Sequence, residues 1–246
     1  MSLDNWPEGV DRRVYASLDS TNAEGARLVP SLTVPTWILA LDQTAARGRR
    51  GRAWVNPAGN FAASLVLRPG DPVEHWALRS FVAALALADT VAHLTGGPRG
   101  ISLKWPNDVL LNGGKLAGIL LESAAPHLVV GIGVNLIAAP AASEVETDAA
   151  RPVSLSQETG LRVTPDDFLT PLAAAYARRE AQFTTYGFAP IRTAWLAQAA
   201  KLGQPIRARI GHDLVPGIFR DVDGTGNLIL ETAQGRRAIP AADIFF

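Results

Sequence analysis

The sequence predicts an α+β fold, in which a large mixed domain of strands and helices precedes a small antiparallel β-barrel. The chain has 246 residues and is 48% hydrophobic, which is enough to fill a substantial core. Strand-like and helix-like segments follow one another up to about residue 202. After Gly203, short apolar runs are separated by glycine turns, as in a small barrel. We therefore expect domains at residues 1–202 and 203–246.

The first half of the chain contains three expected strands and two expected helices. Thr21 and Glu24 have the spacing of a capping box, which predicts a short helix ending at Leu28. A longer helix should end at the breakers that follow residue 95. The strands are expected at residues 14–18, from residue 37, and at 61–67, and the longer helix at 74–94.

The second half begins with a hairpin that contains a polar kink. Strand fragments at 101–105 and 109–111 flank the kink, and Asn112 and Gly113 turn the chain into residues 116–123. Residues 129–136 alternate between apolar side chains and a nearly bare face at Gly131 and Gly133, which suits the approach of a ligand. We also expect a mobile loop at 138–150 and helices at 165–186, capped by Thr164, and at 189–202.

Composition excludes several classes of function. Lysine plus arginine and aspartate plus glutamate both count 23, so no global positive field favours nucleic acid or an anionic membrane. There is no cysteine, which rules out disulfides, thiolate metal sites and a cysteine nucleophile. The start lacks a secretory signal, and the most apolar helix candidate, residues 81–94, is too short to span a bilayer. We expect a cytoplasmic protein without membrane attachment.

Four arginines separated by glycines form a loop, ARGRRGRAW, at residues 46–54. Guanidinium groups are planar and permanently charged, so they bind carboxylate or phosphate oxygens well, and glycines let the loop rearrange around such anions. The alternative interpretation of this segment alone is a solvated basic turn. Gln43 before the loop, and a second polar segment, KWPND at 104–108, favour an anion site.

Four segments in a fixed order resemble the catalytic domain of biotin protein ligases: DSTN at 19–22, QTAARGRRGRAW at 43–54, KWPNDVLLNGGKLAGILLE at 104–122 and GIGVN at 131–135. The resemblance implies a mixed sheet flanked by helices, related to class II aminoacyl-tRNA synthetases, with an SH3-like C-terminal barrel. It also implies two reactions. Biotin is joined to ATP as biotinyl-5′-AMP, and a lysine of a biotin carboxyl carrier domain then takes the biotin.

The resemblance assigns site residues to the two substrates. Amide and hydroxyl groups suit a urea, which carries both donors and acceptors. For biotin the matching residues are Ser20, Thr21, Asn22, Gln43, Arg47, Gly48, Arg49 and Lys115. For ATP, which should arrive with Mg²⁺, they are Arg49, Trp54, Lys104, Asn107, Asp108 and Asn135. The catalytic residues are expected to be Arg49, Lys115 and Asp108; the metal ligands stay open.

Local alternatives exist for several of these residues. Ser20 or Thr21 could only cap the following helix, Lys115 could be a solvated turn residue, and Trp54 could be a core anchor. Asp108 has the chemistry either to assist Mg²⁺ or to accept a proton from the incoming lysine. The family's loop usually begins with glycine where this chain has Ala46, which would be costly if that position required a positive φ.

Other functions are less consistent with the sequence. Lipoate–protein ligases share the fold and the adenylate route, but the arginine loop favours biotin. Octanoyl transferases of this fold need a cysteine nucleophile, and this chain has no cysteine, so this class is excluded. Some biotin ligases are repressors with an N-terminal helix-turn-helix domain, which the 18 residues before DSTN cannot hold, so we expect no DNA binding. Whether the protein forms a homodimer stays open.

Overall fold

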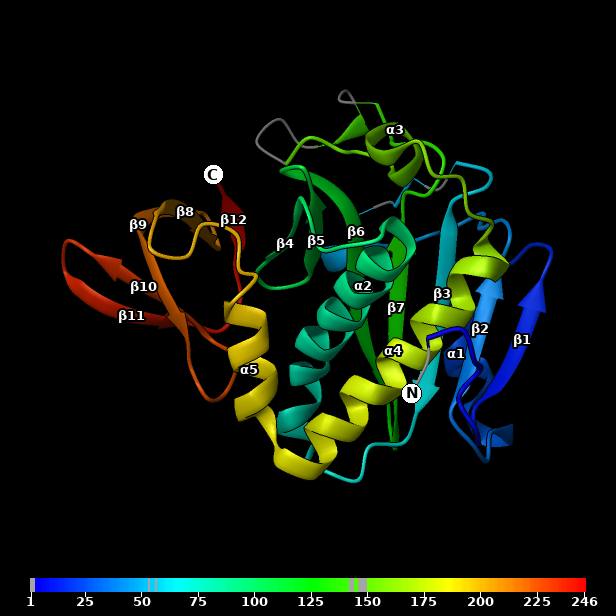
Figure 1. The fold of residues 1–246 in the computed structure, drawn as a ribbon. Coiled ribbons are helices and arrows are strands. Elements are labelled where there is room, and N and C mark those ends of the chain that lie inside the picture. The colour runs from blue at the N-terminus through cyan, green and yellow to red at the C-terminus, as the bar shows by residue number, and fades with distance from the viewer. Residues whose placement is uncertain (1–2, 53, 56, 142–143, 146–149) are drawn as a thin grey trace.

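A computed structural model describes residues 3–52, 54–55, 57–141, 144–145 and 150–246. Part of the loop expected at 138–150 therefore lies outside the described residues. The described chain contains two sheets, one of seven strands and one of five (Figure 1). This arrangement confirms the predicted α+β class, with a mixed sheet flanked by helices and an antiparallel sheet at the C-terminal end. The domain boundary near Gly203 stays a prediction.

The larger sheet has the strand order β1-β2-β3-β7-β6-β5-β4, in which only β1 and β2 pair in parallel. Its strands are β1 (Asp11–Tyr15), β2 (Thr36–Ala40), β3 (Phe61–Leu67), β4 (Ile101–Lys104), β5 (Asp108–Leu111), β6 (Gly114–Ala124) and β7 (His127–Val134). The smaller sheet, in the order β11-β10-β9-β8-β12, contains β8 (Pro205–Ile210), β9 (Asp213–Val222), β10 (Leu228–Thr232), β11 (Gly235–Ile239) and β12 (Asp243–Phe245).

Helices cover both faces of the larger sheet. The helices are α1 (Thr21–Leu28), α2 (Arg79–Thr95), α3 (Leu155–Thr159), α4 (Pro165–Tyr186) and α5 (Phe188–Leu196), with short 3₁₀ segments at Val29–Ser31, Arg49–Gly51 and Val73–Leu78. Figure 1 shows α2 and α4 in front of the sheet and α1 behind it. Alternation along β7 explains this split, because Val130 packs with α2 in the main core and Val129 packs in a small cluster beside α1.

The main core continues from the larger sheet into the C-terminal sheet. Trp195 of α5 packs edge-on against Phe81 of α2 and Phe219 of β9, with ring centroids 5.2 and 6.5 Å apart. In addition, the Trp105 indole donates a hydrogen bond to the carbonyl of Gly226. The two sheets therefore share one core, and this fixes β12 beside the end of β4.

Several elements begin and end where the sequence predicts. The Asn112–Gly113 turn has positive φ at both residues (48° and 79°), as a tight hairpin turn requires. Helix α4 starts after Thr164, whose side chain accepts a hydrogen bond from the backbone N–H of Asp167, and it ends at Gly187. Helix α2 ends at Gly96, which has φ 76°.

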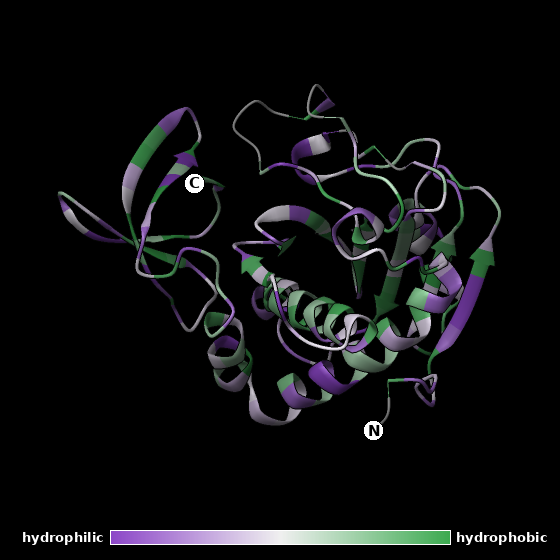
Figure 2. Ribbon diagram, turned by 45° about the horizontal axis from the view of Figure 1, so that its top comes forward, coloured by the Kyte–Doolittle hydropathy of each residue, from purple (hydrophilic) through white to green (hydrophobic). Residues whose placement is uncertain are grey.

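Three predicted boundaries are wrong. The first strand is at 11–15 rather than 14–18, because this edge strand is exposed and is defined by pairing with β2 rather than by a buried face; Figure 2 shows it mostly hydrophilic. The helix predicted at 74–94 starts as a 3₁₀ turn, and α2 begins at Arg79. The helix predicted at 189–202 stops at Leu196, because the following backbone bonds to Leu103 of β4 instead.

Within the described residues, one helical segment, Val73–Thr95, is long and apolar enough to cross a membrane. About 72% of its most apolar stretch is buried inside the protein. This burial is typical of a core helix, and the strands behind it are correspondingly hydrophobic (Figure 2).

Candidate active site

A cavity of about 560 Å³ opens on the α1 side of the larger sheet, between the arginine loop and β12. Every residue that the sequence predicts for the site lines this cavity: Ser20, Thr21, Asn22, Gln43, Arg47, Gly48, Arg49, Trp54, Lys104, Asn107, Asp108, Lys115 and Asn135. These residues come from segments up to 115 positions apart, and their roles stay predictions. Their convergence is what a shared ligand site requires.

One end of the cavity is formed by the start of α1. Ser20 is the N-cap residue of the helix, and its hydroxyl accepts a hydrogen bond from the N–H of Ala23. The cap therefore lies one residue before Thr21, where the capping-box spacing predicted it. Thr21 instead turns to Gln43, whose Oε1 accepts a hydrogen bond of 2.8 Å from the Thr21 N–H. Ser20 therefore both caps the helix and lines the cavity.

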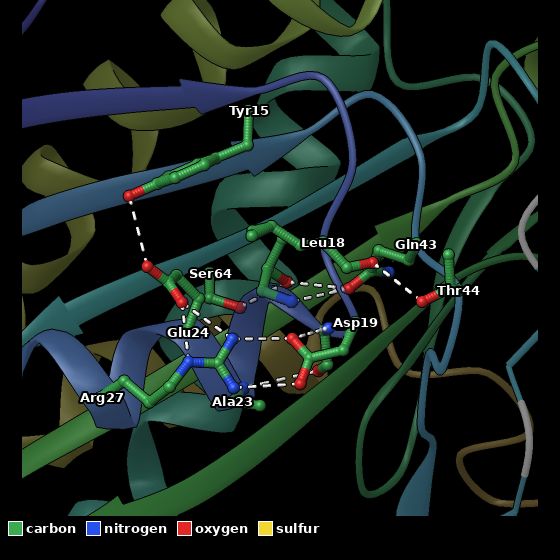
Figure 3. Close-up of polar contacts among 11 residues, drawn as sticks. Tyr15, Leu18, Asp19, Ala23, Glu24, Arg27, Gln43, Thr44 and Ser64 are labelled. Carbon is green, nitrogen blue, oxygen red and sulfur yellow. Dashed lines mark hydrogen bonds and ion pairs between the residues drawn. The ribbon is translucent and has the colours of Figure 1, made fainter.

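Charged side chains outside the cavity hold this end in place. Arg27 contacts both oxygens of Asp19 at 2.7 and 2.9 Å, and its Nε donates to Glu24, which also accepts from Tyr15 (Figure 3). The hydrogen bonds from Arg27 and from the backbone N–H of Ser20 hold the pKa of Asp19 well below its usual value. Asp19 thus stays charged, anchoring the residue just before Ser20.

Glycines on β7 and β6 leave room for two larger side chains. A Cβ on Gly131 would lie 2.2 Å from Asn22 Oδ1, and a Cβ on Gly133 would lie 2.7 Å from the Trp54 indole. The indole also lies against Gly118. The bare strand face was expected to suit the approach of a ligand; in the structure, Asn22 and Trp54 occupy the space directly above the glycines. Trp54 therefore forms part of the cavity floor.

Lys115 and Asp108 line the cavity and contact each other. Lys115 Nζ is 2.7 Å from Asp108 Oδ1 and 5.6 Å from the centre of the Trp54 ring. Lys104 is buried nearby, and this burial lowers the pKa of its amine, although the Asp108 charge opposes the shift. Two lysines around one carboxylate leave an excess of positive charge, which favours an anionic ligand.

Asn135 has a fixed orientation and an unused acceptor. Its Nδ2 donates to the carbonyl of Val153 at 3.0 Å and lies 3.5 Å from that of Lys115. Both partners only accept, so the other atom must be the oxygen. Asn135 Oδ1 is buried and has no hydrogen-bond partner among the described residues. A buried acceptor of this kind calls for a donor from a ligand or water.

The arginine loop folds against the C-terminal sheet. Asp243, at the start of β12, contacts Arg50 at 2.6 Å, Arg52 at 2.8 Å and Arg209 at 2.9 Å. Burial alone would raise the pKa of the Asp243 carboxyl, but the bonds from Arg209 and Arg52, together with the charges of Arg50 and Arg52, lower it. Asp243 therefore stays ionised and ties the loop to β12.

Arg49 differs from its neighbours in the loop. Its side chain is 26% exposed, and its carboxylate contact with Asp243 is long, at 3.9 Å. It also donates a hydrogen bond of 3.3 Å to Asn107. Burial lowers the pKa of this guanidinium, with Asp243 and Asp108 opposing the shift. A partly buried cation with only distant carboxylates is suited to bind an anion.

The loop reaches this position with ordinary backbone at Ala46. The non-glycine residues with positive φ in the described chain are Arg50, Asn112 and Lys201, so alanine at position 46 carries no such penalty. Within the described part of the loop the left-handed residues are Arg50 (φ 57°) and Gly51 (φ 72°). The departure from the usual glycine at position 46 is thus accommodated without backbone strain.

Sequence reasoning missed three residues that support the site. Asp243 lies in a segment that gave no motif. Ser64 was hidden inside the apolar strand FAASLVL, where a single hydroxyl within an apolar run was a usable signal, and the structure buries it fully. Glu122 ends the LAGILLE segment and contacts Asn22 at 2.6 Å and Arg47 at 3.7 Å.

Comparison with known proteins agrees with this geometry. Residues 14–135 match the Biotin/lipoate A/B protein ligase family, and residues 201–246 match the Biotin protein ligase C terminal domain. The chain is 56% identical over 95% of its length to the Biotin–[acetyl-CoA-carboxylase] ligase of Paracoccus denitrificans, covering 99% of that protein. It is 32% identical over 94% of its length to the Bifunctional ligase/repressor BirA of Bacillus subtilis, covering 73% of that protein.

A solved structure shows the same fold. The biotin protein ligase from Aquifex aeolicus in complex with biotin and ATP superposes with a TM-score of 0.83, at 24% identity, covering 95% of this chain and 97% of that one. The assignment to a family rests on the Paracoccus relative, which is similar along nearly the whole of both chains. From the cavity, the two domain matches and this relative together, we conclude that the chain belongs to the biotin protein ligases.

Proposed function

We propose that this chain is a biotin–protein ligase that activates biotin with ATP and transfers it to a lysine of a biotin carboxyl carrier domain. The observation that carries the proposal is the convergence of Arg49, Lys115 and Asp108 with the polar residues of α1 in one cavity. The 56% identical ligase supports the same activity. A carrier domain as the acceptor, a homodimer, the absence of DNA binding and a cytoplasmic location remain predictions.

In the first reaction a carboxylate oxygen of biotin attacks the α-phosphorus of ATP, and the bond to pyrophosphate breaks. Two anions must approach each other, so positive charge aimed at both is the main requirement. Arg49 can bridge carboxylate and phosphate oxygens with its planar fork. Lys115 can stabilise negative charge on the carbonyl and the α-phosphate. The product is biotinyl-5′-AMP.

In the second reaction the ε-amine of the acceptor lysine attacks the carbonyl of the mixed anhydride, and AMP leaves. The amine must lose a proton, and Asp108 is a carboxylate within the cavity that can accept it. The arginine loop, tied to Asp243, covers the labile anhydride and excludes water.

Mg²⁺ is expected to arrive with ATP. This ion keeps several waters and is held mainly by phosphate oxygens together with one or two carboxylates. Asp108 can supply such a carboxylate from the nucleotide side of the cavity. In the parts of the chain that the structure describes, no group of three or more His, Cys, Asp or Glu side chains is clustered for a metal. This donor set fits an ion held largely by its nucleotide, where it would offset phosphate charge.

The direct test is pyrophosphate exchange. ATP and Mg²⁺ should give exchange with biotin, and lipoate in place of biotin should give little. Exchange with lipoate alone would favour the lipoate–protein ligase alternative. Exchange with neither acid would contradict the proposed function.

Asp108→Asn separates the two roles open to Asp108. If Asp108 accepts the proton of the acceptor lysine, the variant should form adenylate at a normal rate but transfer biotin about 10²-fold more slowly. Single-turnover assays of the two half-reactions measure this. Loss of adenylate formation instead would assign Asp108 to the first reaction.

Asp243→Asn should weaken closure of the arginine loop. The amide keeps the size of the side chain but removes the charge that Arg50, Arg52 and Arg209 share. Hydrogen bonds to charged groups contribute about 1.5–3 kcal/mol, so we expect release of free biotinyl-5′-AMP to rise about tenfold or more. Rapid ultrafiltration measures the released adenylate. The exposed Asp213→Asn on β9 is the control, and equal release from both variants would contradict the prediction.

Asn135 and Trp54 predict a preference for adenine. The fixed acceptor Asn135 Oδ1 can take a hydrogen bond from the 6-amino group of adenine, whereas the O6 of guanine would face it with a second acceptor. We expect ATP to be preferred over GTP by about 10²-fold in kcat/KM for pyrophosphate exchange. Asn135→Ala should reduce that ratio, and an unchanged ratio would argue against this contact.

A further inference from the structure

A chain of hydrogen bonds with a fixed direction runs behind the polar end of the cavity. Its members, in order, are Glu122, Asn22, Ser64, Thr21 and Gln43. The Asn22 side-chain amide lies 2.6 Å from Glu122 Oε2 and 3.4 Å from the carbonyl of Leu120. A carboxylate and a carbonyl can only accept, so the Asn22 atom that faces them is Nδ2. Asn22 Oδ1 is thereby directed at Ser64.

The hydrogen bond between Ser64 and Asn22 fixes the direction of the hydrogen bond between Ser64 and Thr21. Its hydroxyl lies 2.5 Å from Asn22 Oδ1, which can only accept, so the single Ser64 proton is donated to Asn22. The contact of 2.8 Å between Ser64 Oγ and Thr21 Oγ1 then needs the Thr21 proton. Thr21 therefore donates to Ser64, and its remaining lone pair is available as an acceptor.

Gln43 is oriented by the backbone. The Thr21 N–H is a donor, so the Gln43 atom 2.8 Å from it must be Oε1. Thr21 Oγ1 lies 3.2 Å from the same oxygen, without a proton between them, because Thr21 has already donated to Ser64. Gln43 Nε2 is left as a donor. Thr21 and Gln43 both line the cavity, so a ligand meets an acceptor beside a donor.

From this chain we infer that Ser64 is a positioning residue that selects the ureido group of biotin by hydrogen-bond direction. A cyclic urea carries an N–H donor next to a C=O acceptor, which complements Thr21 Oγ1 and Gln43 Nε2. Ser64 is fully buried on β3, and Gly131 leaves the space that Asn22 Oδ1 occupies. The inference rests on the proposed function. It adds the reason why the site rejects a ligand that has a donor where the urea has its C=O acceptor.

The test uses Ser64→Ala and 2-iminobiotin, in which a nitrogen donor replaces the ureido oxygen. Removing the Ser64 hydroxyl leaves Asn22 Oδ1 unsatisfied and frees the Thr21 hydroxyl to turn. We expect the KM for biotin to rise about tenfold, while the KM for ATP and kcat stay within about twofold. The unmodified protein should prefer biotin to 2-iminobiotin by about 10²-fold or more, and Ser64→Ala should reduce this preference several-fold.

A buried hydroxyl far from the cavity provides the control. Thr90 on α2 is also fully buried and donates to the carbonyl of Ala86, so Thr90→Val removes a comparable group without touching the chain of bonds. It should leave the KM for biotin and the 2-iminobiotin ratio unchanged. Equal increases in the KM for biotin and for ATP in Ser64→Ala would indicate a merely structural role and would overturn the inference.

Two outcomes separate failure of this inference from failure of the proposed function. Normal biotin-dependent exchange with an unchanged biotin KM in Ser64→Ala would overturn the inference alone. No biotin-dependent exchange in the unmodified protein would contradict the function itself. If Ser64→Ala does not fold, the unmodified protein still provides the test, because equal use of biotin and 2-iminobiotin would also overturn the inference.

Discussion

Replacing Lys115 with methionine should reduce biotin-dependent pyrophosphate exchange by about 10²–10³-fold, the usual effect of losing one preorganised donor at a developing negative charge. Methionine keeps the length and the apolar stem of lysine but removes the ammonium. Lys115 lines the cavity, and its ammonium lies 2.7 Å from Asp108 and above the Trp54 ring. Its loss also leaves Asp108 facing the incoming anions without its nearest cation.

Steady-state exchange at saturating ATP and biotin measures this effect, which should be mostly in kcat because the charge develops in the transition state. Lys201→Met is a suitable control, since Lys201 contacts the Phe246 ring and does not line the cavity. The control should retain activity within about twofold. Retention of full activity by Lys115→Met would contradict the proposed mechanism, because Lys115 is the lysine that forms an ion pair with Asp108 in the described structure.

Replacing Arg79 with methionine should lower the free energy of unfolding by about 3–5 kcal/mol, because it leaves two partly buried carboxylates without their cation. Arg79 is fully buried at the start of α2, and it contacts Asp71 and Glu180, each at 2.7 Å. Its guanidinium also lies 5.0 Å from the centre of the Phe183 ring. Urea unfolding at pH 7 measures the loss. Arg178→Met, which removes an exposed partner of Asp89, should cost about 0–1 kcal/mol.

The defect of Arg79→Met should depend on pH. Burial raises the pKa of Glu180 even in the presence of Arg79, which opposes the shift, so removing Arg79 raises it further. A carboxyl whose pKa is higher in the folded state binds more protons when folded, and the stability that it contributes is lost as pH rises through the folded pKa. The variant should therefore be less defective at pH 5 than at pH 8. An equal defect at both values would mean that packing, and not charge, explains the loss.

The residues that line the site were predictable because they lie in short motifs with their own chemistry. Residue types in the arginine loop and the KWPND segment indicate an anion site, the resemblance of four motifs to biotin protein ligases assigned the individual residues, and all of these side chains line one cavity. The Asn112–Gly113 turn and the Thr164 cap were equally local. The boundaries that failed depend on distant partners. Helix α5 ends at Leu196 because the following backbone pairs with Leu103, which no local pattern reports.

The sequence by itself determined that a large mixed domain precedes a small antiparallel one, and its four motifs, through their resemblance to a family, identified the side chains of the cavity. Each of these features depends on periodicity, turns or motifs within a few residues. Tertiary structure alone decided how these side chains are held. Asp243 meets Arg50 across 193 positions, and Ser64 meets Thr21 across 43. Charge neutralisation and the direction of a hydrogen bond are properties of pairs in space, so they exist only after the chain has folded.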